Sequence, residues 1–254
     1  MPKQLDLRIM SRQLEGRIAL ITGANRGIGL AIAREYAREG AQCLLAGRNR
    51  AALDKVVTEI SAIGGKASPL VLDLERPESI QAALEDLTRR VPRLDVFVAN
   101  GASLGARQPL IKYPLDIWRQ TFQINVHANL QLLQGLDPLL RKSDAGRVIF
   151  LSAAVATNAK VGTGSYAASK AALEAVARIY GIEAKATAIR VNTVSPGATR
   201  TEMRARAAPE EDPMTLKTPE DIAPLFVELA LPSCERHDEW IGADDWLKTR
   251  TASK

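Results

Sequence analysis

Cysteine and histidine are scarce in this chain. The two cysteines, Cys43 and Cys234, and the two histidines, His127 and His237, are scattered over 254 residues. So few residues so far apart cannot build a disulfide framework or a zinc site. No apolar stretch is long enough for a signal peptide or a membrane span. We therefore expect a cytoplasmic protein without a metal site and without a membrane partner.

Aromatic residues are also few, at 4% of the chain, which bears on nucleic-acid binding. The formal net charge of +5 favours such a partner. Lysine and arginine, however, alternate with 29 acidic residues, and no basic run contains aromatic residues. A nucleic-acid binder would need one coherent basic face and salt-dependent binding. We expect no nucleic-acid partner, and assign the positive charge to a cofactor pocket and to solvated surface.

Short apolar runs alternate with longer segments of helical period. The six runs that we interpret as strands are residues 17–21, 42–46, 69–72, 95–99, 147–151 and 190–194. Continuous apolar runs indicate strands buried on both faces, and their alternation with helices predicts a doubly wound parallel sheet. We expect one Rossmann-type α/β domain over residues 1–254, with about seven strands and helices on both faces.

The polar stretch 199–221 interrupts this alternation after the sixth strand. It predicts a loop with a short helix, since a further helical segment, "DIAPLFVELAL", follows it. At the carboxyl edge of the sheet, such a loop would lie over a bound ligand as a lid. A solvated surface insertion is the alternative.

The segment "ITGANRGIGLAIA" follows the first strand and opens a helix. Its glycines, Gly23, Gly27 and Gly29, permit a tight turn that brings backbone N–H groups and the helix N-terminus to a pyrophosphate. A purely structural turn is the other explanation of this spacing.

The end of the second strand, "AGRNR", indicates which dinucleotide is bound. An NAD site would carry an acidic residue there for the ribose hydroxyls, and none is present. The Arg48 guanidinium suits a 2′-phosphate, and Arg26 adds a second positive group. These residues predict NADP(H). Alternatively, Arg48 and Arg50 simply begin a solvated helix.

Tyr166 and Lys170 lie one helical turn apart in "YAASK", after a loop of small residues. A free phenol has a pKa near 10, and a neighbouring ammonium group lowers that value. The pair therefore predicts general acid–base chemistry on a carbonyl or an alcohol. Alone, it could equally be a buried phenol and a lysine on an amphipathic helix.

In this order the motifs resemble the short-chain dehydrogenase/reductase family over roughly residues 15–230. The resemblance implies hydride transfer between NADP(H) and a small carbonyl or secondary alcohol. It implies a catalytic set of Tyr166, Lys170, Asn125 and a serine, in which Lys170 also holds the nicotinamide ribose and Asn125 supports a proton path. The cofactor-binding residues that it implies are Gly23, Asn25, Arg26, Gly27, Ile28, Gly29, Arg48, Asp73, Leu74, Asn100, Tyr166, Lys170, Pro196, Gly197, Thr199 and Thr201.

The serine position departs from the family pattern. The family places this serine thirteen residues before the tyrosine, where this chain has Ala153, and Ser152 lies fourteen before it. Successive strand residues face opposite ways, so Ser152 would point away from the site unless a bulge turned it inward. Two hypotheses remain: Ser152 substitutes as the catalytic serine, or the chain binds NADP(H) with little turnover, as a sensor or a scaffold.

Small residues after Tyr166 favour close helix packing between subunits. Family members commonly dimerise through this helix, so the resemblance implies a homodimer or a tetramer. The family's C-terminal strand motif is absent, and "EWIGADDWLK" stands in its place. This difference puts the tetramer in doubt.

Overall fold

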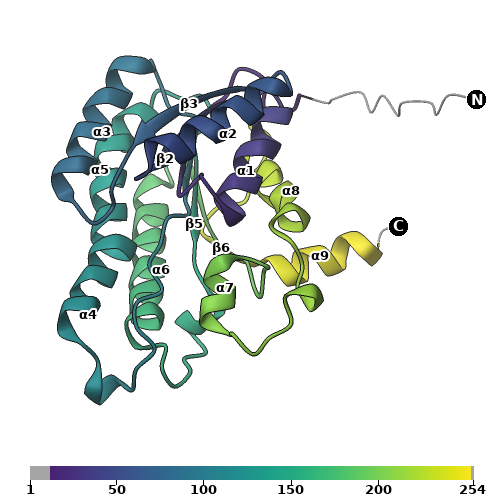
Figure 1. The fold of residues 1–254 in the computed structure, drawn as a ribbon. Coiled ribbons are helices and arrows are strands. Elements are labelled where there is room, and N and C mark those ends of the chain that lie inside the picture. The colour runs from purple at the N-terminus through teal and green to yellow at the C-terminus, as the bar shows by residue number, and fades with distance from the viewer. Residues whose placement is uncertain (1–11, 253–254) are drawn as a thin grey trace, which may run out of the picture.

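The computed structural model describes residues 12–252, so residues 1–11 and 253–254 of the expected domain lie outside the described residues. One parallel sheet organises the chain, with strand order β3-β2-β1-β4-β5-β6-β7 (Figure 1). The strands are β1 (Ile18–Thr22), β2 (Gln42–Gly47), β3 (Lys66–Val71), β4 (Val96–Ala99), β5 (Arg147–Leu151), β6 (Arg190–Ser195) and β7 (Glu239–Gly242).

Helices follow most of the strands, as right-handed crossover connections require. They are α1 (Gly27–Arg38), α2 (Arg50–Ala62), α3 (Pro77–Arg90), α4 (Leu115–Phe122), α5 (Ala128–Leu140), α6 (Gly164–Ala184), α7 (Glu202–Ala207), α8 (Pro219–Ala230) and α9 (Ala243–Ala252). Within residues 12–252, no helix has the length and apolar character needed to cross a membrane.

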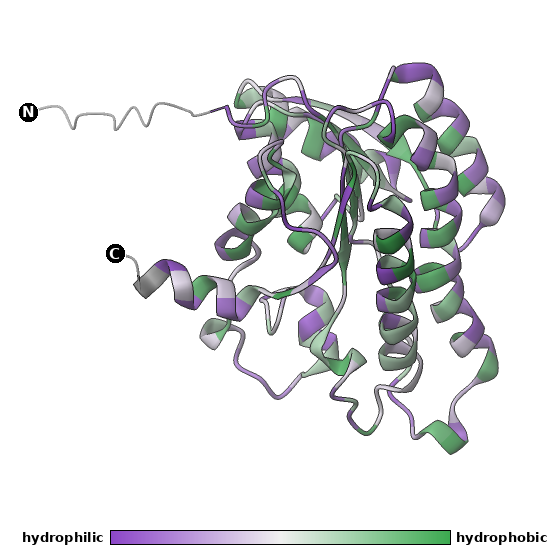
Figure 2. Cartoon of the chain, turned by 180° about the vertical axis from the view of Figure 1, so that it is seen from behind, coloured by the Kyte–Doolittle hydropathy of each residue, from purple (hydrophilic) through white to green (hydrophobic). Residues whose placement is uncertain are grey.

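Two apolar cores lie on opposite faces of the sheet. Ile32 of α1, Leu53 of α2 and Phe226 of α8 pack on one face. Leu87 of α3, Leu136 of α5 and Leu173 of α6 pack on the other. Figure 1 shows these two groups of helices on either side of the strands, and Figure 2 shows hydrophobic colours concentrated along the sheet. The doubly wound fold predicted from the sequence is confirmed.

The strand order reverses between β1 and β4, which are neighbours in the sheet. Connections leave these two strands toward opposite faces, so a crevice forms outside their carboxyl ends. The glycine-rich segment after β1 and the residues after β4, β5 and β6 all lie at this edge. The fold therefore brings most of the predicted site residues to one place.

Two elements differ from the sequence predictions. About seven strands were expected, but the position of β7 was not predicted, because Glu239 and Trp240 are exposed and the strand has no continuous apolar run. The segment 123–127 forms a π-helical turn between α4 and α5 instead of ordinary helix. Such turns are rare and occur frequently at functional sites. The predicted short helix within 199–221 is present as α7.

Candidate active site

The glycine-rich turn after β1 is held by Asn100, which follows β4. The Asn100 amide Nδ2 donates to the Thr22 carbonyl at 2.7 Å, and Gly23 has a φ of +66° that favours glycine. A Cβ atom on Gly29 would lie 2.4 Å from the Gly23 carbonyl oxygen. The turn therefore accepts no side chain at Gly29, which lets the start of α1 pack closely against Gly23 and Asn100.

The N-terminus of α1 lacks a side-chain cap. Its N-cap residue is Arg26, no side chain accepts from the first turn, and that turn contains no acidic residue. Asn49 caps α2 and Thr218 caps α8, whereas α3, α4 and α6 lack a side-chain cap as α1 does. Helix N-termini carry free N–H groups and partial positive charge, which suit an anion. The turn and the uncapped helix fit a dinucleotide pyrophosphate.

Two arginines belong to this region: Arg26 lies in the turn as the N-cap of α1, and Arg48 follows β2. Arg48 is exposed just after β2, whereas the neighbouring Arg50 is bound to Asp54 by Nε bonds of 2.8 and 3.0 Å. Arg26 forms an ion pair with Glu202 of α7. The Asn25 side chain lies against the end of β2, because its Oδ1 would be 3.7 Å from a Cβ atom placed on Gly47. Ile28 packs on the core below.

Asp73 and Leu74 form a defined turn after β3. The Asp73 N–H donates to Ser79 Oγ at 3.0 Å, and its Oδ1 accepts the Glu75 N–H at 3.1 Å. The Leu74 carbonyl accepts a hydrogen bond from Gln123 Nε2 at 3.3 Å. The Leu74 side chain lies close to Gly101, since a Cβ atom placed on Gly101 would be 2.7 Å from Leu74 Cδ1. This geometry places Leu74 against the residues that follow β4.

The Pro-Gly segment after β6 reaches back to the glycine-rich turn. Thr199 Oγ1 donates to the Pro196 carbonyl at 3.0 Å, and Gly197 has a φ of +66°. Thr201 caps α7 and lies 3.4 Å from where a Cβ on Gly27 would stand. The predicted residues on both sides of the crevice therefore face one another.

Tyr166 and Lys170 lie on α6, with Lys170 Nζ 5.9 Å from the centre of the Tyr166 ring. Lys170 is 2% exposed, and its Nζ donates to the Leu151 carbonyl at 2.6 Å. Burial lowers the pKa of Lys170 to about 8 and raises the pKa of Tyr166 to about 12. The lowered phenol pKa expected from the sequence is not found, because burial disfavours the charged phenolate.

Asn125 lies in the π-helical turn and is fully buried. Its Oδ1 accepts the Ser103 N–H at 2.7 Å, and its Nδ2 donates to the Ser103 carbonyl and to Ser169 Oγ, both at 2.9 Å. Asn125 thus joins the loop after β4 to the helix that carries Tyr166 and Lys170.

Ser152 and Ala153 follow β5 in regular extended geometry. The Ser152 N–H continues the ladder to the Val194 carbonyl at 2.9 Å, and Ala153 has φ −157° and ψ 147°. No bulge turns Ser152 toward Tyr166. Its hydroxyl instead donates to Glu174 Oε1 at 2.5 Å.

Several polar residues around the site were not singled out from the sequence. Tyr113 OH lies 2.6 Å from Ser165 Oγ and accepts the Ala106 N–H at 2.7 Å, which fixes the loop before α4 against the start of α6. Glu174 could have been found from its spacing of four residues after Lys170. The Tyr113–Ser165 contact joins residues 52 positions apart, so no local pattern reveals it.

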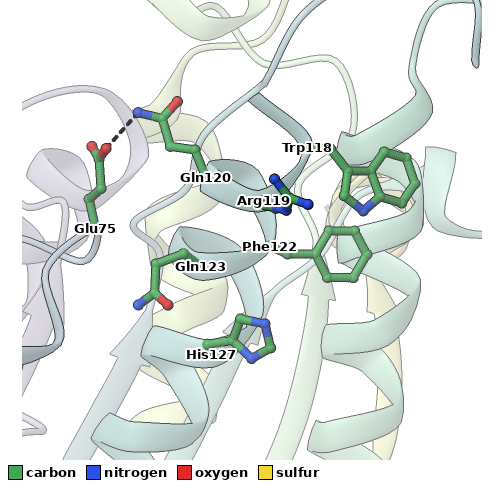
Figure 3. A pocket seen from close by; sticks show the side chains of 7 residues that line it. All are labelled: Glu75, Trp118, Arg119, Gln120, Phe122, Gln123 and His127. Carbon is green, nitrogen blue, oxygen red and sulfur yellow. Dashed lines mark hydrogen bonds between the residues drawn. The ribbon is translucent and has the colours of Figure 1, made fainter. Parts of the chain in front are cut away.

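A surface groove of about 550 Å³ lies over α4 and the π-helical turn. Figure 3 shows Trp118 and Phe122 on one side of it and the hydrogen-bonded Gln120 and Glu75 on the other. Trp118 and Phe122 stack with ring centres 5.2 Å apart. The groove is lined by none of the predicted site residues, so we place the active site in the crevice instead.

Comparisons with known proteins show the family to which the chain belongs. The family model for short chain dehydrogenases matches residues 17–212. The chain therefore belongs to the short-chain dehydrogenase/reductase family, as the motifs predicted. An uncharacterised oxidoreductase of Escherichia coli K12, YciK, is 41% identical over 219 residues, which cover 85% of this chain and 86% of that protein.

More distant relatives and solved structures extend the comparison. A 3-oxoacyl-[acyl-carrier-protein] reductase, FabG of Pseudomonas aeruginosa, is 33% identical over 78% of this chain and 79% of its own. A Shigella flexneri short chain dehydrogenase complexed with NADP superposes with a TM-score of 0.88 at 39% identity, covering 92% of this chain and 99% of that one. An Escherichia coli CFT073 structure complexed with NADPH has the same TM-score and identity, covering 92% and 98%.

Proposed function

We propose that this chain is an NADP(H)-dependent oxidoreductase that transfers a hydride between nicotinamide and the carbonyl or secondary alcohol carbon of a small molecule. One observation carries the proposal. The uncapped glycine-rich turn and the Tyr166–Lys170 pair lie at the same carboxyl edge of the sheet, where doubly wound folds bind their ligands. NADP(H) supplies the hydride chemistry there.

The arginines support NADP(H) over NAD(H). Arg48 is exposed after β2, where a carboxylate would be needed for an unphosphorylated ribose. The solved relatives complexed with NADP and NADPH agree with this choice. On this proposal, Arg48 and Arg26 bind the 2′-phosphate, Asp73 and Leu74 lie by the adenine, and Gly23 and Gly29 line the pyrophosphate.

Tyr166 is the proton donor for carbonyl reduction in this proposal. With a pKa raised to about 12 by burial, the phenol is protonated near neutrality, as reduction requires. Lys170, with a pKa near 8, still carries its charge at pH 7 and stabilises the phenolate that proton transfer leaves behind. Asn125 holds the loop after β4 against α6 and so keeps this pair in place.

Ala153 leaves the substrate oxygen without the family's serine hydroxyl. Loss of such a donor typically costs about 10²–10³ in rate, which is a reduction and not an abolition of catalysis. The competing hypothesis, a cofactor-binding protein with little turnover, requires that the remaining phenol be insufficient. We favour turnover, because the Tyr166–Lys170 pair is complete.

Residues 199–221 form the lid in this proposal, within a single domain. The Arg26–Glu202 ion pair spans the crevice, and Lys217 Nζ donates to Asp244 Oδ1 and to the Ala198 carbonyl at 2.5 and 2.9 Å. These contacts tie both ends of the segment to the site. Movement of α7 would then admit the cofactor.

A homodimer through α5 and α6 completes the proposal. Leu130, Ile179 and Ile182 are exposed on these helices, at 41%, 56% and 63%. Apolar side chains on neighbouring helices suit a second copy of the chain, as relatives of this family commonly form. Sedimentation at micromolar concentration tests it, and a monomer would exclude it.

The activity is tested by NADPH oxidation against ketones, diketones, quinones and acyl thioesters, with the natural chain beside Ala153→Ser. We expect turnover from the natural chain and a gain of about 10- to 1000-fold from the serine variant. A natural chain that binds NADPH but stays silent while Ala153→Ser turns over would favour the cofactor-binding protein instead.

A further inference from the structure

Glu174 lies on α6 one turn beyond Lys170 and two turns beyond Tyr166, on the same side of the helix. Its Oε1 accepts two hydrogen bonds, from Ser152 Oγ at 2.5 Å and from Trp240 Nε1 at 2.9 Å. Ser152 follows β5 and Trp240 lies in β7, and these strands are separated by β6. One carboxylate therefore joins the catalytic helix to two strands.

Lys170 is anchored at the same strand end. Its Nζ donates to the carbonyl of Leu151, the residue directly before Ser152. The ammonium group is buried, which disfavours its charge, and the Glu174 carboxylate acts on its pKa in the opposite direction. Glu174 thus opposes the effect of burial on the Lys170 pKa.

Few other charged groups face Lys170. Residues 148–152, in β5 and directly after it, and 191–195 of β6 carry no charged side chain, and the π-helical turn contributes the buried neutral Asn125 and the exposed His127. On α4, which also packs against α6, Asp116 and Arg119 are exposed. Tyr166 contacts the lysine through its ring.

We propose that Glu174 is a positioning residue for Lys170. Ser152 and Trp240 hold the Glu174 carboxylate in place. Ser152 therefore acts through Glu174 and does not donate to the substrate. The inference rests on the proposed function, in which the lysine charge serves Tyr166. A serine hydroxyl has a single hydrogen, and Ser152 already gives it to Glu174. In this proposal the C-terminal segment "EWIG" helps to position Lys170, because it provides Trp240.

The test follows the titration of Lys170 itself and needs neither cofactor nor substrate. Full-length protein with ¹³C-labelled lysine gives one Cε signal per lysine, and the Lys170 signal is assigned by its loss in Lys170→Met. Glu174→Gln keeps an acceptor oxygen for both partners and removes only the charge. We expect it to lower the pKa of Lys170 by about one unit.

Two further variants examine the hydrogen bonds. Ser152→Ala and Trp240→Phe each remove one donor to Glu174, so we expect smaller shifts in the same direction. Trp240 is half-exposed, which makes Trp240→Phe a second test if Glu174→Gln does not fold. Glu183→Gln makes the same charge change at an exposed position on α6 and serves as the matched control, with no expected shift.

An unchanged Lys170 titration in Glu174→Gln would overturn the proposal. So would a Ser152→Ala variant that loses NADPH oxidation while Lys170 titrates as before, because Ser152 would then be a donor to the substrate. If Lys170 shifts as expected but no carbonyl is reduced, the positioning role stands and the proposed function fails.

Discussion

Lys170 Nζ lies 5.9 Å from the centre of the Tyr166 ring and donates to the Leu151 carbonyl at 2.6 Å. The end of β5 thus holds the ammonium group beside the phenol. Lys170 is buried and Tyr166 is half-buried, and loss of solvent shifts their pKa values in opposite directions, to about 8 for the lysine and about 12 for the tyrosine. Each shift disfavours the charged form, so near neutrality only the charged lysine loses free energy on burial, and its bond to Leu151 offsets part of that loss.

The buried lysine makes folding stability depend on pH. Its pKa is about 8 in the folded chain and 10.5 ordinarily, so the unfolded chain binds more protons between these values. The contribution of Lys170 to the free energy of unfolding therefore rises through this window, by at most about 1.4 kcal/mol per pH unit. We expect the natural chain to gain stability relative to Lys170→Met from neutrality to pH 10.5, as measured by urea unfolding.

Comparing the natural chain with Lys170→Met cancels the contributions of other buried groups to the pH dependence of stability. Burial raises the pKa of Cys43 to about 12, which lowers stability at high pH in both proteins alike. Parallel stability curves for the two proteins would show that Lys170 titrates normally in the folded chain.

Arg48 is expected to select the phosphorylated cofactor. Arg48→Gln removes a charge-assisted hydrogen bond to the 2′-phosphate, so NADPH affinity should fall by about tenfold while NADH affinity stays the same. Arg50→Gln is the matched control, because Arg50 is already bound to Asp54. Fluorescence titration with each cofactor measures both constants. An equal loss of affinity for NADPH and NADH in Arg48→Gln would refute the assignment of Arg48 to the 2′-phosphate.

Glu202 is expected to compete with the cofactor for Arg26. Both side chains of this ion pair are more than half exposed, at 62% and 61%, so the pair itself contributes little to stability. Glu202→Gln should free Arg26 and tighten NADPH binding by up to about fivefold at low salt, with the gain fading as salt rises. Glu210→Gln, exposed on the same segment, is the control. Weaker NADPH binding by Glu202→Gln would contradict the lid as described.

The fold was predictable because its signals are local. The apolar run 147–151 is β5 itself, and the glycines after β1 mark the turn that the structure forms. β7 escaped prediction because an edge strand that pairs with β6 alone needs no apolar run. The π-helical turn at Asn125 also has no local signal, since its cause is the bonding of Asn125 to Ser103 and Ser169.

The site was predictable as a set of residues but not as a set of contacts. Spacing placed Lys170 one turn from Tyr166, and strand alternation suggested that Ser152 points away from the site; in the structure its hydroxyl donates to Glu174. The partner of Ser152 depends on how α6 packs across β5, β6 and β7, so Glu174 and Trp240 meet only in the folded chain. The opposed pKa shifts likewise arise from burial, which spacing does not reveal.

Tyr166→Phe tests the central claim most directly, in NADPH oxidation with a carbonyl that the natural chain reduces. The variant keeps the ring and removes the proton donor, so we predict a loss of about 10²–10⁴ in kcat with NADPH affinity unchanged. A Tyr166→Phe protein that reduces the carbonyl at the natural rate would show that the phenol does not donate the proton, and the proposed chemistry would be wrong.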